Sequence, residues 1–518
     1  MTTITLSADD YHALLDEQQK LTQQLRLMTV ERDLLQERVN AFLHRLFAAK
    51  SEARENPAQR DLFLNEAEAL APQGSPIAEE ALPEAVAVAS HSRTKRGRRP
   101  LDPHLPREIM RHELPEAERV CTHDGARLVE IGAVISEQLD IIPQQVRVIQ
   151  HQRIKYACPC CDDSIRVTPA PARIIPKGLL TEAALAWIVT AKYQDSLPLY
   201  RQAALLGRFG GDLSRTTLAA SMVRVGQAVQ PVINLLRDHL LESDLILGDE
   251  TVIQVLKESG RAAQSKSYLW AQMTGSGPPI RLFSYTPGRS GEHAKTLYQG
   301  IRSGVALMSD GYEVYNTIAA THGAIHLGCW AHARRYFVEA EAVLPKAARG
   351  PEQLATQFIA AIGDLYVIEA KAKALSTEQR AQMRQQLSQP VLVKIEGLLV
   401  QHLHTVVPGS LLGKALHYLS SQWPKLTRFV ENGAWPIDNN RCENAIRPFV
   451  VGRRNWLFCD TVAGAHASAN LYSLIETCKA NDIEPYVYLI ELFRQLPRAK
   501  TVEDFEALLP WHLSKSTT

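Results

Sequence analysis

Two aspartates follow apolar runs with the composition of buried strands. Asp249 ends the run 245–248, and Asp310 follows the run 304–308. Short apolar runs of this kind are typical of strands inside a sheet. The apolar alternation continues over 251–255, and two further strand-like runs, 268–273 and 280–285, and a short helical segment, 292–298, follow before Asp310. This order predicts that both carboxylates lie side by side at one sheet edge.

Two neighbouring carboxylates repel each other unless a divalent cation lies between them. Carboxylate oxygens suit Mg²⁺ or Mn²⁺, and two such ions can activate water and stabilise the leaving oxygen in phosphodiester cleavage. A single aspartate after a strand is usually a turn residue, but two in this order indicate a metal site. A third acid has to come from a later helix, and Glu443 supplies it.

The segment around Glu443 has a helical pattern of its own. Asp438 can cap a helix on which Glu443 and Arg447 share a face at i,i+4. By itself this pattern is equally that of a capped surface helix with a salt bridge. Arg441, Arg447, Arg453 and Arg454 surround the single acid, which gives a local excess of positive charge suited to DNA phosphates.

Charge over the whole chain gives no such indication, because 57 lysines and arginines balance 56 aspartates and glutamates. A second local cluster lies at the end of a linker-like stretch, 71–92, that is rich in proline, alanine and glutamate. Its members are Arg93, Lys95, Arg96, Arg98 and Arg99. An extended segment of this kind can follow a phosphate backbone, although a solvated charge run is an equal alternative.

Four residues have the types and spacing of a tetrahedral zinc site. Cys158 and Cys161 form a C-x-x-C pair, and Cys121 pairs upstream with either Asp124 or His123. Strand-like runs at 138–142 and 145–149 separate the two halves, as in a zinc ribbon. The alternative is a group of reduced cysteines under a loop. Eight cysteines in 518 residues are too sparse for a disulfide framework.

Helices are expected over 181–226. A Gly-Gly break at 210–211 separates two of them, and Ser214 can cap the second. The outline is that of a helix-turn-helix with Arg215 on its exposed first turn, where it can reach DNA. A helical hairpin without a DNA contact has the same pattern.

The N-terminal segment 11–47 carries two interleaved apolar seams at sevenfold spacing, with polar interruptions at Gln18 and Arg32. This pattern favours a short coiled coil and self-association over a helix packed on its own domain. The first residues lack a basic segment followed by an apolar stretch, and no apolar run approaches a membrane span. We therefore expect a cytoplasmic protein with no membrane partner.

Other residues have less specific patterns. Cys329 and His332 form a C-x-x-H pair that is open to a metal role, but a structural role in orienting its helix is favoured because only two ligands are present. We expect Trp330 and Trp456 to pack in the protein interior. The thiols of Cys442, Cys459 and Cys478 have no metal spacing and are expected to be buried.

Four sequence blocks together resemble the insertion-sequence-66 family of bacterial transposases. They are GDET around Asp249, SDGY around Asp310, LGCWAHARRYF at 327–337 and DNNRCENAIRP around Glu443. The resemblance implies a ribonuclease-H-like fold on which Asp249, Asp310 and Glu443 are a catalytic DDE triad. It also implies inverted-repeat and target DNA as partners, accessory proteins from the same element, and a location at the nucleoid in the bacterial cytoplasm. Asp124 departs from the family pattern, which has a cysteine there.

The expected chain is thus a multidomain protein of mixed α+β and α/β class. Its predicted parts are a coiled coil (1–50), a linker with the basic segment (51–110), a zinc-ribbon-like module (111–175), an HTH-like helical region (176–240), a catalytic core (241–345 and 436–480), a helical insertion (346–435) and a helical tail (481–518). The helices of the insertion are expected to break at Pro390, Pro408 and Pro424. The expected function is metal-dependent 3′-end cleavage and strand transfer. The alternatives are a non-catalytic DNA-binding regulator and a ribonuclease-H-type nuclease without strand transfer.

Overall fold

The computed structural model describes residues 8–47, 109–110, 127, 145–157, 165–345 and 349–513. Several predicted positions lie outside these residues. They are the zinc ligands Cys121, Asp124, Cys158 and Cys161, the alternative ligand His123, and the basic segment 93–99.

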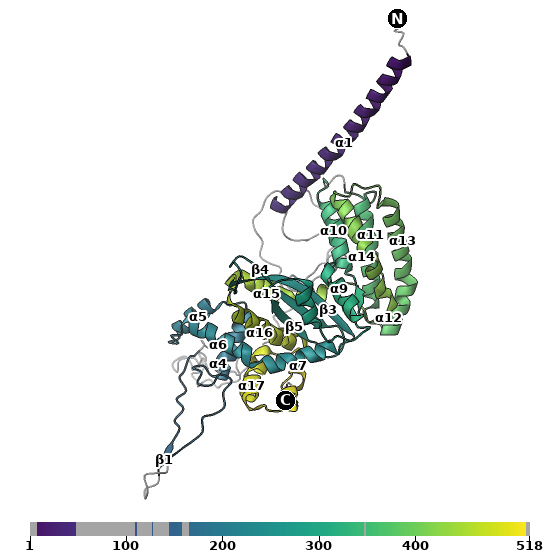
Figure 1. The fold of residues 1–518 in the computed structure, drawn as a ribbon. Coiled ribbons are helices and arrows are strands. Elements are labelled where there is room, and N and C mark those ends of the chain that lie inside the picture. Colours follow the sequence, from purple (N-terminus) through teal and green to yellow (C-terminus); the bar gives the residue numbers. More distant parts are fainter. Residues whose placement is uncertain are drawn as a thin grey trace. The chain divides into compact units, whose positions relative to one another are not determined.

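A mixed sheet forms the centre of the structure (Figure 1). Its strands are β3 (Leu245–Lys257), β4 (Lys266–Thr274), β5 (Arg281–Thr286), β6 (Ala306–Met308) and β7 (Ile325–Leu327), in the order β5-β4-β3-β6-β7. The pairs β5-β4 and β4-β3 are antiparallel, whereas β3-β6 and β6-β7 are parallel. β3 is therefore the central strand at which the antiparallel meander meets the parallel half.

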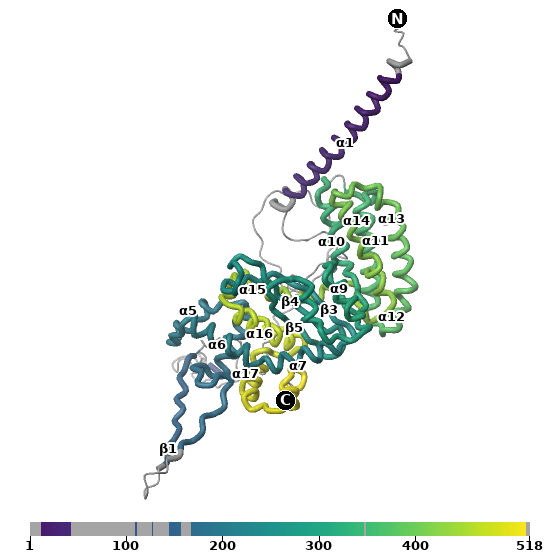
Figure 2. The backbone as a smooth tube through the Cα atoms, in the orientation of Figure 1, coloured from purple at the N-terminus to yellow at the C-terminus, as the bar shows by residue number. Residues whose placement is uncertain are grey.

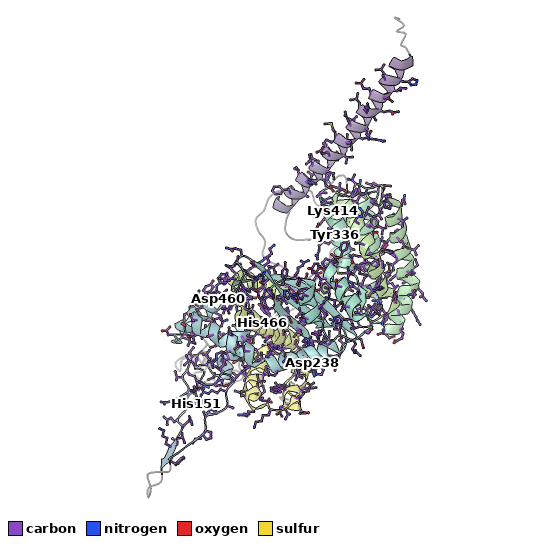
Figure 3. The ribbon with its side chains drawn as sticks, in the orientation of Figure 1. His151, Asp238, Tyr336, Lys414, Asp460 and His466 are labelled. Atoms are coloured by element: carbon purple, nitrogen blue, oxygen red, sulfur yellow. The ribbon has the colours of Figure 1, made fainter. Side chains whose placement is uncertain are left out.

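β3 unites the predicted strand that ends at Asp249 with the apolar alternation predicted over 251–255. Asp249 was expected at the end of a strand, but it lies within one continuous strand of 13 residues. The physical reason is pairing on both sides of this position. β4 pairs with β3 as far as Gln254, and β8 (Cys459–Thr461) pairs with Val255 and Lys257. Lys257 also forms a 2.8 Å ion pair with Asp460 of β8, which Figure 3 labels.

Helix α16 (Val462–Ala480) covers part of the sheet. It is buried along most of its length because it packs against β5 and against α6 (Arg215–Ala228). The backbone N–H of Phe283 in β5 donates a 2.8 Å hydrogen bond to the Ser473 hydroxyl. This helix therefore joins the sheet to the helical region that precedes it in sequence.

The helical region before the sheet contains α4 (Glu182–Tyr193), α5 (Leu199–Arg208), α6 and α7 (Gln230–Leu241). α5 and α6 form the predicted hairpin around the glycine break, where Gly210 has a φ of 81°. Ser214 caps α6 as expected, because its hydroxyl accepts a 3.0 Å hydrogen bond from the N–H of Thr217. The predicted N-cap is confirmed.

A helical bundle separates β7 from the return of the chain to the sheet, as the backbone path in Figure 2 shows. Its helices are α10 (Trp330–Ala342), α11 (Leu354–Ala372), α12 (Thr377–Met383), the π-helical segment η3 (Arg384–Ser388), α13 (Gln389–His402) and α14 (Leu411–Leu426). A separate apolar core, which includes Trp330, Phe358 and Leu416, holds these helices together. Pro424 was expected to break this region, but it lies inside the last turn of α14.

Both ends of the chain are helical. α1 (Ala8–Phe47) is one uninterrupted helix whose apolar side chains, among them Leu21, Met28 and Leu35, are exposed. After α16 come α17 (Pro485–Gln495), η5 (Leu496–Arg498), α18 (Val502–Glu506) and α19 (Pro510–Leu513). None of the described helices is long and apolar enough to cross a membrane.

The predicted strand at 145–149 is wrong. The structure assigns no strand to these residues, and Val148 is 94% exposed. The strands described in this part of the chain are instead β1 (Lys155–Ala157) and β2 (Ile165–Val167), which pair antiparallel. The alternating β-branched residues of 145–149 were not sufficient to predict which segment pairs as a strand.

Candidate active site

The register of the parallel pair β3-β6 places two acidic residues beside each other. Leu247 of β3 pairs with Met308 of β6. Asp249 and Asp310 each lie two residues further along, so they are equivalent positions on neighbouring chain segments. Asp249 accepts a 2.8 Å hydrogen bond from the N–H of Glu250, and Asp310 accepts a 2.9 Å bond from that of Tyr312. A backbone N–H one or two residues further along the chain thus orients each carboxylate.

Glu443 reaches the same site from the first turn of α15 (Asn440–Trp456). The N-cap of this helix is Asn439 and not Asp438, as the sequence suggested. Asp438 instead accepts a 3.1 Å hydrogen bond from the N–H of Asn440. The Asn439 amide is used elsewhere, because its Nδ2 donates a 3.0 Å bond to the carbonyl oxygen of Gly248. The start of α15 is therefore fixed to the residue before Asp249.

The electrostatics show that the three predicted acids lie close together. Burial is the largest cause that raises the pKa of Asp249 well above its ordinary value. The negative charges of Glu250, Asp310 and Glu443 raise the same pKa further. Buried carboxylates that repel one another are relieved by a divalent cation, and their hard oxygens are the ligands that Mg²⁺ and Mn²⁺ prefer. The residues present therefore fit such an ion.

A fourth acid, Glu250, was not predicted from the sequence. Its side chain is only 4% exposed, its carboxylate accepts a 2.9 Å hydrogen bond from the Tyr315 hydroxyl, and Arg289 lies 3.7 Å away. Burial, together with the charge of Asp310, raises the pKa of Glu250 to about 7. The acid was visible in the GDET block, but neighbouring side chains of a strand point to opposite faces, so its place beside Asp249 in the sequence did not indicate a role in the site.

Glu443 has two basic neighbours on α10. Arg335 Nη2 lies 3.3 Å from Oε2, and His332 Nδ1 lies 3.6 Å from Oε1. Burial lowers the pKa of His332, an effect that the charge of Glu443 opposes. The Sγ of Cys329 lies in the same group, since ligand atoms of Cys329, His332 and Glu443 are all within 4.8 Å of one another. Glu443 thus joins Cys329 and His332 as the third residue of the group, which the spacing of the C-x-x-H pair did not show.

The predicted DNA-binding arginines in the described part of the chain lie on two different helices. Arg215 is exposed on α6, whereas Arg447, Arg453 and Arg454 lie on α15. Arg454 is exposed and Arg447 is half-buried. Arg453 already donates hydrogen bonds to the carbonyl oxygen of Val252 and, at 3.4 Å, to the Thr251 hydroxyl. It thereby links α15 to β3.

The remaining predictions concern packing. Trp330 is fully buried, and Trp456 packs against Phe449 and Tyr472, as expected. The thiols of Cys442 and Cys478 are buried, while Cys459 is half-buried. Tyr418 of α14 lies against Gly311 of the SDGY block and stacks on Tyr336 of α10 with a centroid separation of 4.5 Å; Tyr336 is labelled in Figure 3. The bundle therefore contacts the site directly.

The mixed sheet and its converging carboxylates define an α/β protein with an acidic site suited to divalent cations. The chain belongs to the IS66 family of transposases, because the family model described as "Transposase IS66 family" matches residues 177–467. Further models match other parts. They are the zinc-finger binding domain of transposase IS66 (118–162), the IS66 C-terminal element (473–511) and a model described as "Transposase C of IS166 homeodomain" (34–109). The resemblance of the sequence blocks is confirmed, and the zinc-finger match supports a zinc site in this chain.

Similar proteins occur in Sinorhizobium fredii. The uncharacterized protein y4qI is 32% identical over 435 residues, which cover 81% of this chain and 78% of that protein. The uncharacterized protein y4jD is 31% identical over 424 residues, which cover 79% and 81%. Among solved structures, a chain of the Drosophila P element transposase strand transfer complex is similar at 12% identity and a TM-score of 0.35, over 59% of this chain and 93% of that chain.

Proposed function

We propose that this protein is a DNA transposase that binds terminal inverted repeats, cleaves the 3′ ends of the element and transfers them to target DNA. The observation that carries the proposal is the equivalent position of Asp249 and Asp310 on neighbouring segments, with Glu443 held beside them by the start of α15. The order of three antiparallel and two parallel strands supports the ribonuclease-H-like core that the family resemblance implies.

In this proposal Asp249, Asp310 and Glu443 hold Mg²⁺ or Mn²⁺. When bound, such ions activate the attacking oxygen and stabilise charge on the leaving oxygen. The chain's own residues orient the ligands. Asn439 fixes the helix that carries Glu443, and Arg335 holds one oxygen of that carboxylate. Both strand hydrolysis and transfer are in-line displacements, so no covalent bond between enzyme and DNA is required.

The remaining contacts with DNA and zinc follow the sequence predictions. We assign phosphate contacts to Arg215, Arg447 and Arg454 and to the basic segment 93–99. Arg453 positions α15, because its guanidinium is bonded to β3. Zn²⁺ is assigned to Cys158 and Cys161, with an upstream pair from Cys121 and either Asp124 or His123.

Self-association is assigned to α1. Its exposed apolar side chains recur at the spacing of a coiled-coil seam, for example Leu14, Leu21, Met28 and Leu35. An isolated helix of this length that exposes such a seam gains stability by burying it against a second helix. We retain the expectation that accessory proteins of the same element take part.

The test uses duplex DNA containing the inverted repeats that flank the gene. Wild-type protein should nick the 3′ end in Mg²⁺, and Asp249→Ala should abolish nicking while it leaves end binding intact. Asp244→Ala is the matched control, because Asp244 is an exposed acid just before β3 and its ion pair with Arg302 is worth little. Nicking by Asp249→Ala at the wild-type rate would overturn the proposal.

The two alternatives give different results in the same assay. A nuclease without strand transfer would nick the ends but would not join pre-cleaved ends to a target plasmid. A non-catalytic regulator would bind the ends without nicking them. The repulsion among Asp249, Asp310 and Glu443 argues against a regulator, since half-buried acids that lie this close are costly unless they hold a cation.

A further inference from the structure

Three different donor types meet at the N-terminal end of α10. Cys329 is the N-cap of this helix, His332 lies in its first turn, and Glu443 approaches from α15. Their ligand atoms all lie within 4.8 Å of one another. We infer that Cys329, His332 and Glu443 form a Zn²⁺ site that shares Glu443 with the carboxylate site.

The two oxygens of Glu443 face different partners. Oε2 takes the 3.3 Å contact with Arg335, which leaves Oε1 facing His332 Nδ1 at 3.6 Å. Among the described residues, neither Oε1 nor Nδ1 has a hydrogen-bond partner, although both atoms are buried. A buried acceptor and a ring nitrogen that face each other without a hydrogen bond are satisfied when one cation binds both.

Cys329 is the buried member of the group that it forms with His332 and Glu443. The residue is 1% exposed, and the backbone N–H of Asn439 donates a 3.2 Å hydrogen bond to its Sγ. Burial raises the pKa of the Cys329 thiol, and this N–H opposes that rise by stabilising the thiolate, which is the form that binds metal. The side chains of His332 and Glu443 are 20% and 26% exposed, so an ion can enter from their side and keep a water as its fourth ligand.

The donor set selects a softer ion than the neighbouring carboxylates do. One thiolate, one imidazole and one carboxylate with an open position is a set that Zn²⁺ accepts in tetrahedral geometry, whereas Mg²⁺ prefers oxygen ligands. Binding would replace the thiol proton of Cys329, which is released to solvent. The site therefore takes Zn²⁺ and releases one proton.

The shared ligand has a regulatory consequence that rests on the proposed function. Oε1 of Glu443 cannot bind Zn²⁺ and the divalent ion of the carboxylate site equally well, because the two ions require different coordination geometries. Zn²⁺ bound at Cys329 and His332 should therefore compete with the divalent ion of the carboxylate site. The inferred site makes the protein sensitive to inhibition by zinc.

The first test measures metal binding without activity. In the full-length chain, the module cysteines Cys121, Cys158, Cys160 and Cys161 are replaced by serine, and Co²⁺ is titrated as a spectroscopic probe. We expect a thiolate-to-cobalt charge-transfer band that disappears in Cys329→Ser and weakens at least about tenfold in affinity in His332→Gln. Cys478→Ser, a buried thiol outside the group, should keep the band. A band that survives Cys329→Ser would overturn the inference.

A second measurement covers the case in which the multiple variant does not fold. Zinc per chain is measured for wild type, Cys329→Ser and Cys329→Ala after purification in Zn²⁺ and removal of free metal. Each Cys329 variant should contain one zinc fewer than wild type, and equal zinc content would contradict the site. A thermal unfolding midpoint recorded for each variant identifies loss of fold.

A third measurement separates this inference from the proposed function. Zn²⁺ is titrated into the Mg²⁺-dependent nicking assay, with each protein's rate without zinc as its own reference. The zinc concentration for half inhibition should rise at least about tenfold in Cys329→Ser. An unchanged value would overturn the competition. Absence of nicking in the wild type would instead overturn the transposase proposal, while the cobalt band and zinc content would still decide the site.

Discussion

The Asn439 side-chain amide donates a 3.0 Å hydrogen bond to the carbonyl oxygen of Gly248, which immediately precedes Asp249. Asn439 is fully buried and is the N-cap of α15. This bond and the bonds of Arg453 to Thr251 and Val252 join the strand that carries Asp249 to the helix that carries Glu443. Because Gly248 and Asn439 are far apart in sequence, the Asn439 bond constrains the separation of Asp249 and Glu443, which local structure alone cannot set.

Replacing Asn439 with alanine should therefore affect both stability and nicking. The change leaves the Gly248 carbonyl oxygen buried without its donor, a loss of about 1–3 kcal/mol in the free energy of unfolding. Nicking should fall by at least about tenfold, because a displaced ligand loses positioning. The control is Asn455→Ala, whose amide bonds the Ser196 carbonyl oxygen at an exposed site. A normal nicking rate in Asn439→Ala would show that this bond does not position Glu443.

Binding of Mg²⁺ should stabilise the wild-type protein. The carboxylates of Asp249, Asp310 and Glu443 repel one another in the metal-free state, and a cation removes that cost. Thermal unfolding with and without Mg²⁺ measures the effect. Asp249→Asn should unfold at a higher temperature than wild type in EDTA and should gain less from Mg²⁺. An equal Mg²⁺ shift in both proteins would place the cation elsewhere.

The metal-free protein should lose stability as pH rises. The pKa of Glu250 is raised to about 7 from an ordinary value of 4.5, so between these values the folded state holds a proton that the unfolded state has released. This contribution is fully present below pH 4.5 and is lost as pH rises through 7. Asp249, Asp310, Tyr315 and Arg289 face the same carboxyl group.

Denaturant unfolding in EDTA over this pH range measures that contribution. Glu250→Gln should flatten the pH dependence, because the amide cannot titrate. Glu313→Gln, which changes an exposed carboxylate of α9 (Glu313–His322), should leave the slope unchanged. The expectation fails if Glu250→Gln and wild type show the same slope.

Gly248 should not tolerate a side chain. A Cβ at this position would meet the hydroxyl of buried Tyr298 and lie 3.0 Å from Cε1 of Tyr315. Gly248→Ala should therefore cost about 1–3 kcal/mol of unfolding free energy. The second change Tyr298→Phe removes the colliding oxygen and should restore part of the loss, as measured by chemical denaturation.

A matched glycine gives the opposite expectation. Gly363 lies inside α11, and a Cβ there would meet nothing within 4 Å. Gly363→Ala should stabilise the protein by about 1 kcal/mol, because alanine favours the helix. Destabilisation at both glycines would indicate that the cost at position 248 is not steric.

The sequence predicted the acidic residues but not how they are fixed. Apolar runs before Asp249 and Asp310 located the strands, since buried strands have a recognisable composition. The roles of Glu250 and Asn439 were missed, because both depend on contacts between distant segments that periodicity does not report. The same limit applies to Cys329 and His332, whose third neighbour lies on another helix.

The predictions of helix boundaries were likewise correct in one case and wrong in others. Ser214 was predicted correctly as an N-cap, because capping is local and its hydroxyl bonds a residue three positions on. Asp438 was predicted as a cap and is not one, since Asn439 occupies that position while its amide bonds a strand. Pro424 was read as a helix break, yet α14 continues around it to Leu426. A tertiary contact distinguishes Asn439, whose amide bonds β3 and not its own helix.

The helical bundle lies between β7 and α15 in the chain, so the segments that carry Asp249 and Asp310 are synthesised well before Glu443. Domains generally fold as units while the chain emerges, and the bundle has a core of its own. No growing chain that stops short of α15 holds all three carboxylates. Translation therefore delays assembly of this group of acids until the bundle has left the ribosome. Under the proposed function, C-terminally truncated products should lack DNA cleavage.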